Sequence, residues 1–185
     1  MSVILGIDPG SIKTGWGIIE NHRGKLRCAG FGVIYLQEKN GFAGRLGQLG
    51  SELQKIIVQY KPAMMSVEKI FLGKNADSAF KLGHARGVAL GLAGQNNLAV
   101  GEYATRHVKK MLTGTGAATK EQVQFMIEQI LQIKVKELDA TDALALAVCH
   151  ARAAEVEDML NRQKDINGHK NIVSQRKVNI KESEV

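Results

Sequence analysis

Four acidic residues occur in settings that are unusual for charged side chains. Asp8 ends an apolar, β-branched stretch, and Glu68 lies inside the apolar run 64–70. Asp139 and Asp142 form a D-x-x-D pair at the expected start of a helix. Positions i and i+3 of a helix place two Cβ atoms about 5–6 Å apart on one face, so these two carboxylates can point the same way.

Carboxylates in such places need a compensating partner, because an isolated buried charge costs several kcal/mol. Clustered carboxylates also repel each other and raise each other's pKa. A divalent cation offsets both effects, and ligation by oxygen alone suits Mg²⁺ or Mn²⁺ rather than Zn²⁺. Two such ions about 3.5–4 Å apart can activate water and stabilise the leaving oxygen in phosphodiester hydrolysis. The four acids together predict metal-dependent hydrolysis of a phosphodiester.

Each acid taken alone also has a structural explanation. Asp8 precedes Pro9 and Gly10 and could organise the turn there. Asp139 could be an N-cap or a partner of the helix dipole. Glu68 could pair with a buried arginine. The catalytic interpretation therefore depends on all four acids occurring together in a basic chain, since spacing alone does not show that they converge.

The chain as a whole is basic. Its 185 residues contain 25 Lys and Arg against 18 Asp and Glu, a formal net charge of +7. This balance favours an anionic partner, either nucleic acid or a membrane surface, without choosing between them. Hydrophobic residues make up 44% and charged residues 23%, which is typical of globular proteins and excludes a wholly disordered chain.

The termini and cysteines bear on the compartment. No basic segment precedes an apolar one at the N-terminus, and no stretch approaches the roughly 18 apolar residues of a spanning helix. Cys28 and Cys149 lie far apart and form no ligand-like pair. Free thiols without an export signal fit a reducing compartment. We therefore expect a cytoplasmic protein with no membrane association.

The elements that must position the acids follow from apolar periodicity. Strands are expected over residues 2–7, 14–20, 26–36, 63–70 and 98–102. Helices are expected over residues 46–60, 75–95, 104–112, 119–133 and 138–160, with Asn75 as an N-cap and a capping box from Thr119 to Gln122. Three strands with short links, followed by alternating helices and strands, predict an α/β fold with a mixed five-stranded sheet flanked by helices.

The composition changes near Gln163. The stretch after this residue is polar and lacks periodicity, and it holds five Lys or Arg against three Asp or Glu. We expect one nuclease domain over residues 1–160 and a polar, mobile C-terminal tail over residues 161–185.

The stretches around the four acids closely resemble the RuvC family of crossover (Holliday) junction endodeoxyribonucleases. They are, in order, ILGIDPGSIKTGWGII at 4–19, VEKIFLGKNADSAFKLGHARG at 67–87, EYATRHVKKMLTGTGAATKEQV at 102–123 and DATDALALAVCH at 139–150. The resemblance implies an RNase H-like fold and a homodimer that makes paired, symmetric, Mg²⁺-dependent nicks in four-way DNA junctions during recombination and repair. Two Mg²⁺ ions per site are expected, with Mn²⁺ able to substitute. Branch-migration partners of the RuvA and RuvB type are also implied.

The resemblance assigns roles to individual residues. The family's metal-binding acids fall on the four carboxylates Asp8, Glu68, Asp139 and Asp142. Its assisting basic positions fall on Lys109 and Lys120, which could stabilise charge on the scissile phosphate. Without the resemblance, an unplaced lysine is more often a solvated surface residue.

Further residues are candidates for DNA contact. Phe71 matches an aromatic that stacks on bases at the junction centre, whereas without the resemblance an aromatic here more often packs in the core. Candidate phosphate contacts with less individual support are Lys74, Lys81, Arg86, Lys110, Lys13 and Arg106.

A glycine stripe marks the helix expected over 75–95. Gly83, Gly87 and Gly91 recur every four residues, although each costs about 1 kcal/mol relative to Ala. Such a stripe suggests that another backbone approaches closely. The partner would be the chain's own sheet or, as the resemblance implies, a second copy across a two-fold axis.

Three other functions remain open. A non-catalytic protein that binds DNA structures would explain the charge but leave the four acids without a role. An actin-type ATPase is suggested loosely by the segment 8–10 near Gly15 and Gly17, although 185 residues are few for two large lobes. RNase H activity on RNA–DNA hybrids would use the same metal chemistry on another substrate.

Overall fold

The computed structural model describes residues 1–69, 76–157, 159 and 160. Residues Met1–Ala151 form one compact unit, and Arg152–Val185 are grouped separately. This division falls before the boundary expected at residue 160, and the expected tail lies outside the described residues. All the described site residues lie in the first unit.

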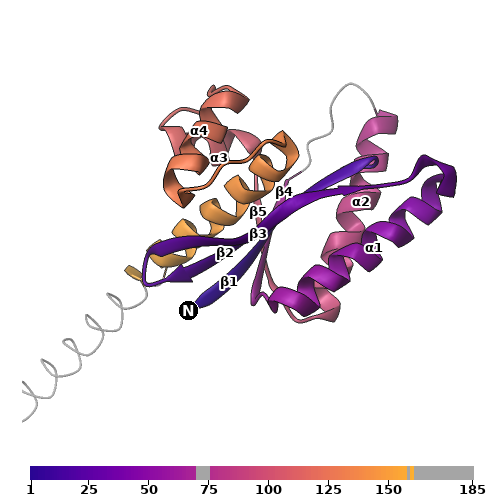
Figure 1. Cartoon of the computed structure of the whole chain (residues 1–185), viewed down its shortest axis with the longest axis horizontal. Coiled ribbons are helices and arrows are strands. Elements are labelled where there is room, and N and C mark those ends of the chain that lie inside the picture. The colour runs from indigo at the N-terminus through magenta and orange to yellow at the C-terminus, as the bar shows by residue number, and fades with distance from the viewer. Residues whose placement is uncertain (70–75, 158, 161–185) are drawn as a thin grey trace, which may run out of the picture. The chain divides into compact units, whose positions relative to one another are not determined.

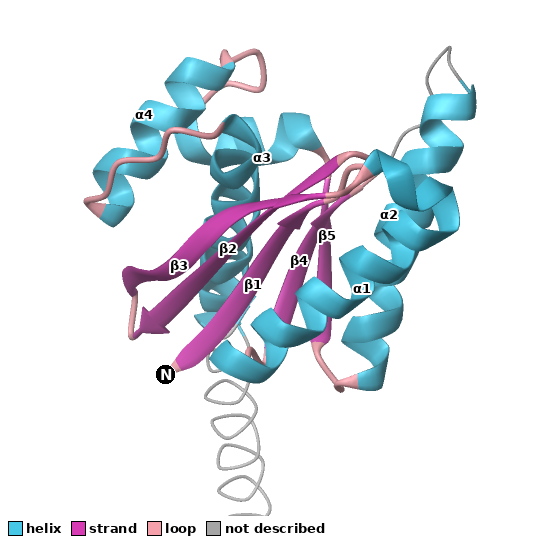
Figure 2. Cartoon of the chain, turned by 45° about the vertical axis from the view of Figure 1, so that its right-hand side comes forward, coloured by secondary structure: helices cyan, strands magenta, loops and turns pink. Residues whose placement is uncertain are grey.

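One mixed sheet of five strands organises this unit (Figure 1). Figure 2 shows the strand order, β3-β2-β1-β4-β5. The first three strands form an antiparallel meander: β1 (Ser2–Asp8), β2 (Lys13–His22) and β3 (Lys25–Tyr35). The last two run parallel to β1: β4 (Met64–Glu68) and β5 (Ala99–Tyr103). The predicted mixed sheet is confirmed. Its parallel strands bring the carboxyl ends of β1, β4 and β5 to one edge.

Helices cover both faces of the sheet (Figure 2). Helices α1 (Gly41–Tyr60) and α2 (Ala76–Gln95) pack on the face that presents Leu5 and Ile7. Helices α3 (Thr105–Thr113) and α4 (Lys120–Leu131), with the last helix from residue 138, enclose the other core, which includes Ile4. Alternate residues of β1 thus enter opposite cores, as the period of a strand requires.

The last helix lies with its backbone almost directly on β1 and β2. Gly6 and Gly17 are cross-strand partners there, and Gly15 is the partner of Asp8. A Cβ on Gly6 would stand 1.9 Å from the carbonyl oxygen of Ala143 in the helix. The three glycines therefore form a strip of the sheet without side chains. This strip allows the backbone of the last helix to pack directly against the strands.

Most element boundaries agree with the expected ones to within two residues, but α1 begins earlier, at Gly41. A short 3₁₀ turn, η1 (Glu38–Asn40), precedes α1. Glycines in the first turns of α1 interrupt the apolar periodicity there. The capping box at Thr119 and Gln122 is confirmed. The expected N-cap Asn75 lies outside the described residues. Within the described ranges, no helix has both the length and the apolar character needed to cross a membrane.

Candidate active site

The two strand acids are neighbours at the carboxyl edge of the sheet. Ile7 of β1 and Val67 of β4 are register partners in a parallel pair, so Asp8 and Glu68 follow at the ends of adjacent strands. The turn after Asp8 is closed by the buried Thr14 hydroxyl, which accepts from the Gly10 amide and donates to the Gly10 carbonyl, each at 3.1 Å. Because Thr14 closes this turn, the Asp8 carboxylate is left available for another role.

The two helix acids arrive from the opposite end of the unit's sequence. The last helix begins at residue 138, so Asp139 and Asp142 lie in its first turns. A Cβ on Gly15 would stand 1.9 Å from the Asp139 carbonyl oxygen, which places the start of this helix directly over β2 beside Asp8. The fold thus brings all four predicted acids to one edge of the sheet.

A cavity of about 270 Å³ opens at this edge. Polar side chains that line it are Asp8, Glu68, Thr105, Lys109, Lys120 and Asp142. Its apolar wall comes from α3, α4 and the last helix, through Val108, Val123, Ala145 and Leu146. Five of the six residues predicted to carry the chemistry therefore share one cavity, and the sixth, Asp139, lies close enough to influence Asp8.

Asp8 is the most perturbed acid of the group. Its pKa is raised from 3.8 to about 8, mainly by burial and further by the neighbouring carboxylates of Asp142, Glu68 and Asp139, while Lys120 opposes the rise. Without a cation, Asp8 holds a proton at neutral pH. A buried group that titrates next to like charges is typical of a functional site.

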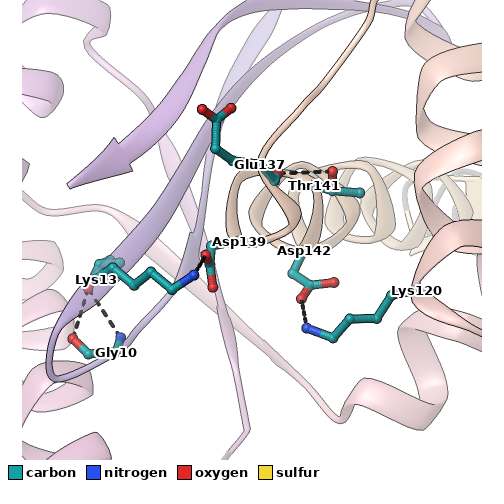
Figure 3. Close-up of polar contacts among 8 residues, drawn as sticks. Gly10, Lys13, Lys120, Glu137, Asp139, Thr141 and Asp142 are labelled. Atoms are coloured by element: carbon teal, nitrogen blue, oxygen red, sulfur yellow. Dashed lines mark hydrogen bonds and ion pairs between the residues drawn. The ribbon is translucent and has the colours of Figure 1, made fainter. Parts of the chain in front are cut away.

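Two lysines bind the helix acids (Figure 3). The Lys13 Nζ lies 2.5 Å from Asp139 Oδ2, and the Lys120 Nζ lies 2.9 Å from Asp142 Oδ2. These hydrogen bonds raise the pKa of both lysines, so both ammonium groups stay charged. Lys13 was predicted only as a phosphate contact. Its ion pair with Asp139 forms because the last helix packs on the sheet, and no local sequence pattern predicts that packing.

The carboxylates suit a hard cation by their chemistry. Within the described part of the chain, no three His, Cys, Asp or Glu side chains form a group already placed to hold a metal ion. Two of the four acids are instead occupied by lysines. The donor set nevertheless consists of carboxylate oxygens alone. Burial and the neighbouring carboxylates both raise the pKa of Asp8, and a divalent cation would offset both effects.

Two residues contact Glu68, and the arginine among them binds its backbone carbonyl rather than pairing with its carboxylate, as the structural alternative supposed. The Thr105 hydroxyl, at the start of α3, donates to Glu68 Oε1. The Arg86 Nε donates to the Glu68 carbonyl oxygen at 3.2 Å, and its Nη2 lies 2.5 Å from Glu102 Oε2. Thr105 lies two residues after the end of β5, and a threonine so near the end of a strand beside the Glu68 strand was the available signal for it. The predicted role of Arg86 as a phosphate contact gains no support from this pairing.

The other candidate DNA contacts are scattered. Lys110 is exposed on α3, and Lys81 is exposed on α2 in an ion pair with Asp77 at 2.6 Å. Phe71 and Lys74 lie outside the described residues. Their predicted roles stay predictions.

The glycine stripe of α2 faces open space. No described atom lies within 4 Å of a Cβ built on Gly83, Gly87 or Gly91, so the chain's own sheet is not its partner. An open groove runs beside the stripe between α1 and α2, lined among others by Leu46 and Phe80. The Phe80 side chain is 66% exposed. This surface is apolar and unpartnered within the described chain.

The pKa of Asp8 predicts how the stability of the metal-free protein changes with pH. The folded chain keeps a proton on Asp8 up to about pH 8, whereas the unfolded chain releases it near pH 3.8. The folded state binds more protons across this interval, so its stability falls as the pH rises. We expect Asp8→Asn to melt above the wild type at pH 8 in EDTA, with a difference that shrinks toward pH 4. Equal melting temperatures at pH 8 would contradict the perturbed carboxyl.

The strand order, the helices on both faces and the acids at the carboxyl ends of β1 and β4 together define an RNase H-like nuclease fold. The family model described as "Crossover junction endodeoxyribonuclease RuvC" matches residues 4–150. The chain belongs to the RuvC family.

Relatives and solved structures agree with this assignment. The RuvC of Bdellovibrio bacteriovorus is 47% identical over 161 residues, covering 86% of this chain and 96% of the relative. The RuvC of Geobacter sp. strain M21 is 46% identical over 159 residues, covering 85% and 97%. The structure titled "T. thermophilus RuvC in complex with Holliday junction substrate" is 29% identical, with a TM-score of 0.80 over 85% of this chain and 97% of that one. The yeast mitochondrial resolvase Ydc2, at 16% identity and a TM-score of 0.63, shares the fold over 88% of this chain and 85% of its own.

Proposed function

We propose that this protein resolves Holliday junctions by making paired, symmetric nicks in four-way DNA during recombination and repair. The observation that carries the proposal is the cavity in which Asp8, Glu68 and Asp142 meet Lys109 and Lys120, in a chain of the RuvC family. The likeness to the T. thermophilus enzyme solved with its junction substrate supports the choice of substrate.

In this proposal Asp8, Glu68, Asp139 and Asp142 hold Mg²⁺, two ions per site, and Mn²⁺ can substitute. The bound cations supply Lewis-acid activation of water and neutralise charge on the scissile phosphate. The chain's own contribution is to fix the carboxylates on two strand ends and one helix, and to keep an apolar wall on one side of the cavity. A rigid support of this kind limits the reorganisation needed during the reaction.

Lys120 and Lys109 supply positive charge to the same cavity. Lys120 is held by Asp142, so its ammonium is oriented before DNA arrives. An oriented cation near the phosphate stabilises negative charge that develops as the bond breaks.

Lys120→Ala is therefore expected to reduce the single-turnover cleavage rate by about 10-fold or more, with junction affinity changed by less than about 3-fold. Lys120→Arg should recover part of the rate, because it keeps the charge but not the shape. Cleavage timed by gel electrophoresis and binding measured by fluorescence anisotropy separate the two quantities. An equal loss in rate and affinity would make Lys120 a binding residue.

The proposal assigns DNA binding to the basic and aromatic residues that the family resemblance indicated, namely Phe71, Lys74, Lys81 and Lys110. Each phosphate that a lysine neutralises on a duplex arm should steepen the salt dependence of binding by roughly 0.9 log units per log unit of salt. Junction binding across a salt series, wild type against single alanine variants, measures each contribution.

Two symmetric cuts need two related sites, which a two-fold homodimer supplies. The open glycine stripe and the apolar groove on α1 and α2 provide a surface on which a second copy could pack closely. We assign the dimer contact to this surface.

Phe80→Glu is expected to convert the dimer to a monomer and to abolish paired nicking, because it places a charge in the groove. Phe125→Glu on α4 is the matched control, since the Phe125 side chain is 59% exposed on the other side of the sheet. Sedimentation velocity reports the oligomeric state. If the Phe80→Glu variant still forms a dimer as stable as that of the wild type, the interface lies on another surface.

The deciding experiment is cleavage of a labelled synthetic four-way junction with and without Mg²⁺, beside linear duplex and RNA–DNA hybrid controls. Symmetric nicks in the junction alone support the proposal. Hybrid cleavage would keep the metal site but change the substrate, and tight binding without nicks would favour a structural DNA-binding protein. Cooperation with RuvA and RuvB type proteins and a cytoplasmic location remain predictions that follow from this function.

A further inference from the structure

Arg86 connects α2 to the end of the strand that carries Glu68. Its Nε donates to the Glu68 carbonyl oxygen at 3.2 Å, and its Nη2 lies 2.5 Å from the Glu102 carboxylate on β5. The Arg86 side chain is only 20% exposed. One guanidinium therefore ties a helix to the ends of two neighbouring strands.

The carbonyl that Arg86 binds belongs to the last residue of β4. The register of β4 and β5 ends with Glu68 opposite Tyr103, and the next amide, of Lys69, still bonds to the Tyr103 carbonyl at 2.9 Å. A carbonyl at the end of a strand has lost its ladder partner and needs another donor. Arg86 provides this donor, while Thr105 holds the side-chain carboxylate of the same residue.

We propose that the Arg86–Glu102 pair is a positioning device that fixes the end of β4 and thereby aims the Glu68 carboxylate into the cavity. This inference rests on the proposed function, in which Glu68 takes part in cleavage. Glu102 orients the guanidinium, and the guanidinium fixes the backbone from which the Glu68 side chain extends. A planar group with donors in fixed directions can make both contacts at once, which a lysine cannot do.

The same geometry argues against a direct contact between Arg86 and DNA. A phosphate would have to displace Glu102 from a guanidinium that is already neutralised and largely covered. A free surface arginine would affect binding and its salt dependence. A positioning residue instead affects the rate of the bound complex, because a misplacement of about 1 Å at the site can cost about 100-fold.

The test uses three variants of the full-length protein. Arg86→Leu removes both contacts. Arg86→Lys keeps the positive charge but lacks the planar guanidinium that makes two contacts at once. Glu102→Gln keeps the shape of the side chain without its charge. The control is Arg27→Leu, which removes an exposed Arg–Glu pair between β2 and β3, with Arg27 Nη2 at 2.7 Å from Glu20 Oε2. Each variant is assayed for junction affinity without divalent cations, single-turnover cleavage at saturating protein, Mg²⁺ dependence and melting temperature.

We expect Arg86→Leu to cut at least about 10-fold more slowly than the wild type, with junction affinity within about 2-fold. Arg86→Lys should not restore the rate. Glu102→Gln should slow cleavage in the same direction, although it frees Arg86 for any phosphate. Arg27→Leu should cleave at the wild-type rate.

Several results would overturn the inference. Weaker junction binding by Arg86→Leu with an unchanged cleavage rate would make Arg86 a DNA contact, as would faster or tighter action by Glu102→Gln. Full rescue by Arg86→Lys would reduce its role to charge. A fall in rate matched by the Arg27→Leu control would show a general effect on the sheet.

Failure of the proposed function looks different. In that case the wild type itself does not cut the junction, or Glu68→Gln cuts as fast as the wild type. A wild type that cuts and a Glu68→Gln that does not, beside an unaffected Arg86→Leu, would reject only the positioning role.

Discussion

Asp8→Asn is expected to lower the rate of junction cleavage by at least about 1,000-fold while leaving junction affinity within about 2-fold. The amide keeps the shape of the side chain but removes the charge at the centre of the carboxylate group. A factor of about 1,000 corresponds to about 4 kcal/mol, which is within the range that metal-assisted stabilisation of a transition state supplies. Binding should survive, because affinity for DNA depends mainly on basic side chains.

The comparison is made in single turnover, with affinity measured separately. Glu52→Gln on α1 is a suitable control, because it removes a carboxylate that is paired with Lys55 at 2.7 Å, on a helix that the cavity does not include. Full cleavage by Asp8→Asn would remove Asp8 from the active site. Lost cleavage together with lost binding would mean that the substitution acts on DNA recognition instead.

Gly15→Ala should be a highly damaging substitution, although it adds a single methyl group. The new Cβ would stand 1.9 Å from the Asp139 carbonyl oxygen, which belongs to a helix backbone and cannot move aside alone. The start of the last helix must shift away from β2, taking both of its aspartates with it. We expect cleavage to fall by about 100-fold or more. Overpacking of about 1–3 kcal/mol should also lower the melting temperature by several degrees.

Gly47→Ala provides the opposite case. Nothing lies within 4 Å of a Cβ at Gly47, which is in the interior of α1. This change should raise stability by up to about 1 kcal/mol and leave cleavage unchanged, since Ala favours the helix. If Gly15→Ala cleaves at the wild-type rate, the bare strip on the sheet does not set the position of the helix acids.

Much of the fold could be predicted from local patterns. The apolar, β-branched runs of the meander are distinct enough for the strand ends to be placed within two residues, and the capping box at Thr119 marks the start of α4. The start of α1 could not be placed, because Gly41 and Gly44 interrupt the apolar period there. Local sequence patterns predict a helix or strand correctly where the apolar residues that give the pattern are also the residues that pack in the core.

Local sequence patterns could not predict that the four acids lie close together in space. Asp8 and Asp139 are far apart in sequence, and what joins them is the absence of side chains at Gly6, Gly15 and Gly17. Two of these glycines suggested a phosphate loop of the actin type, whereas the structure places both inside β2. A glycine that allows another backbone to pack against it carries no functional group that a sequence pattern could identify. Its role can be seen only in a structure that includes the helix packed on it.

The position of the last helix also has a consequence for the order in which a new chain acquires activity. A chain is made from its N-terminus, and elements that are already complete can begin to fold as they emerge. The five strands of the sheet end by Tyr103, but Asp139 and Asp142 come near the end of the compact unit and dock back onto its first two strands. A nascent chain that stops before residue 138 has the sheet and lacks half of the carboxylates. On the proposed function, such a chain cannot cut DNA, and activity arises only once the compact unit is nearly complete.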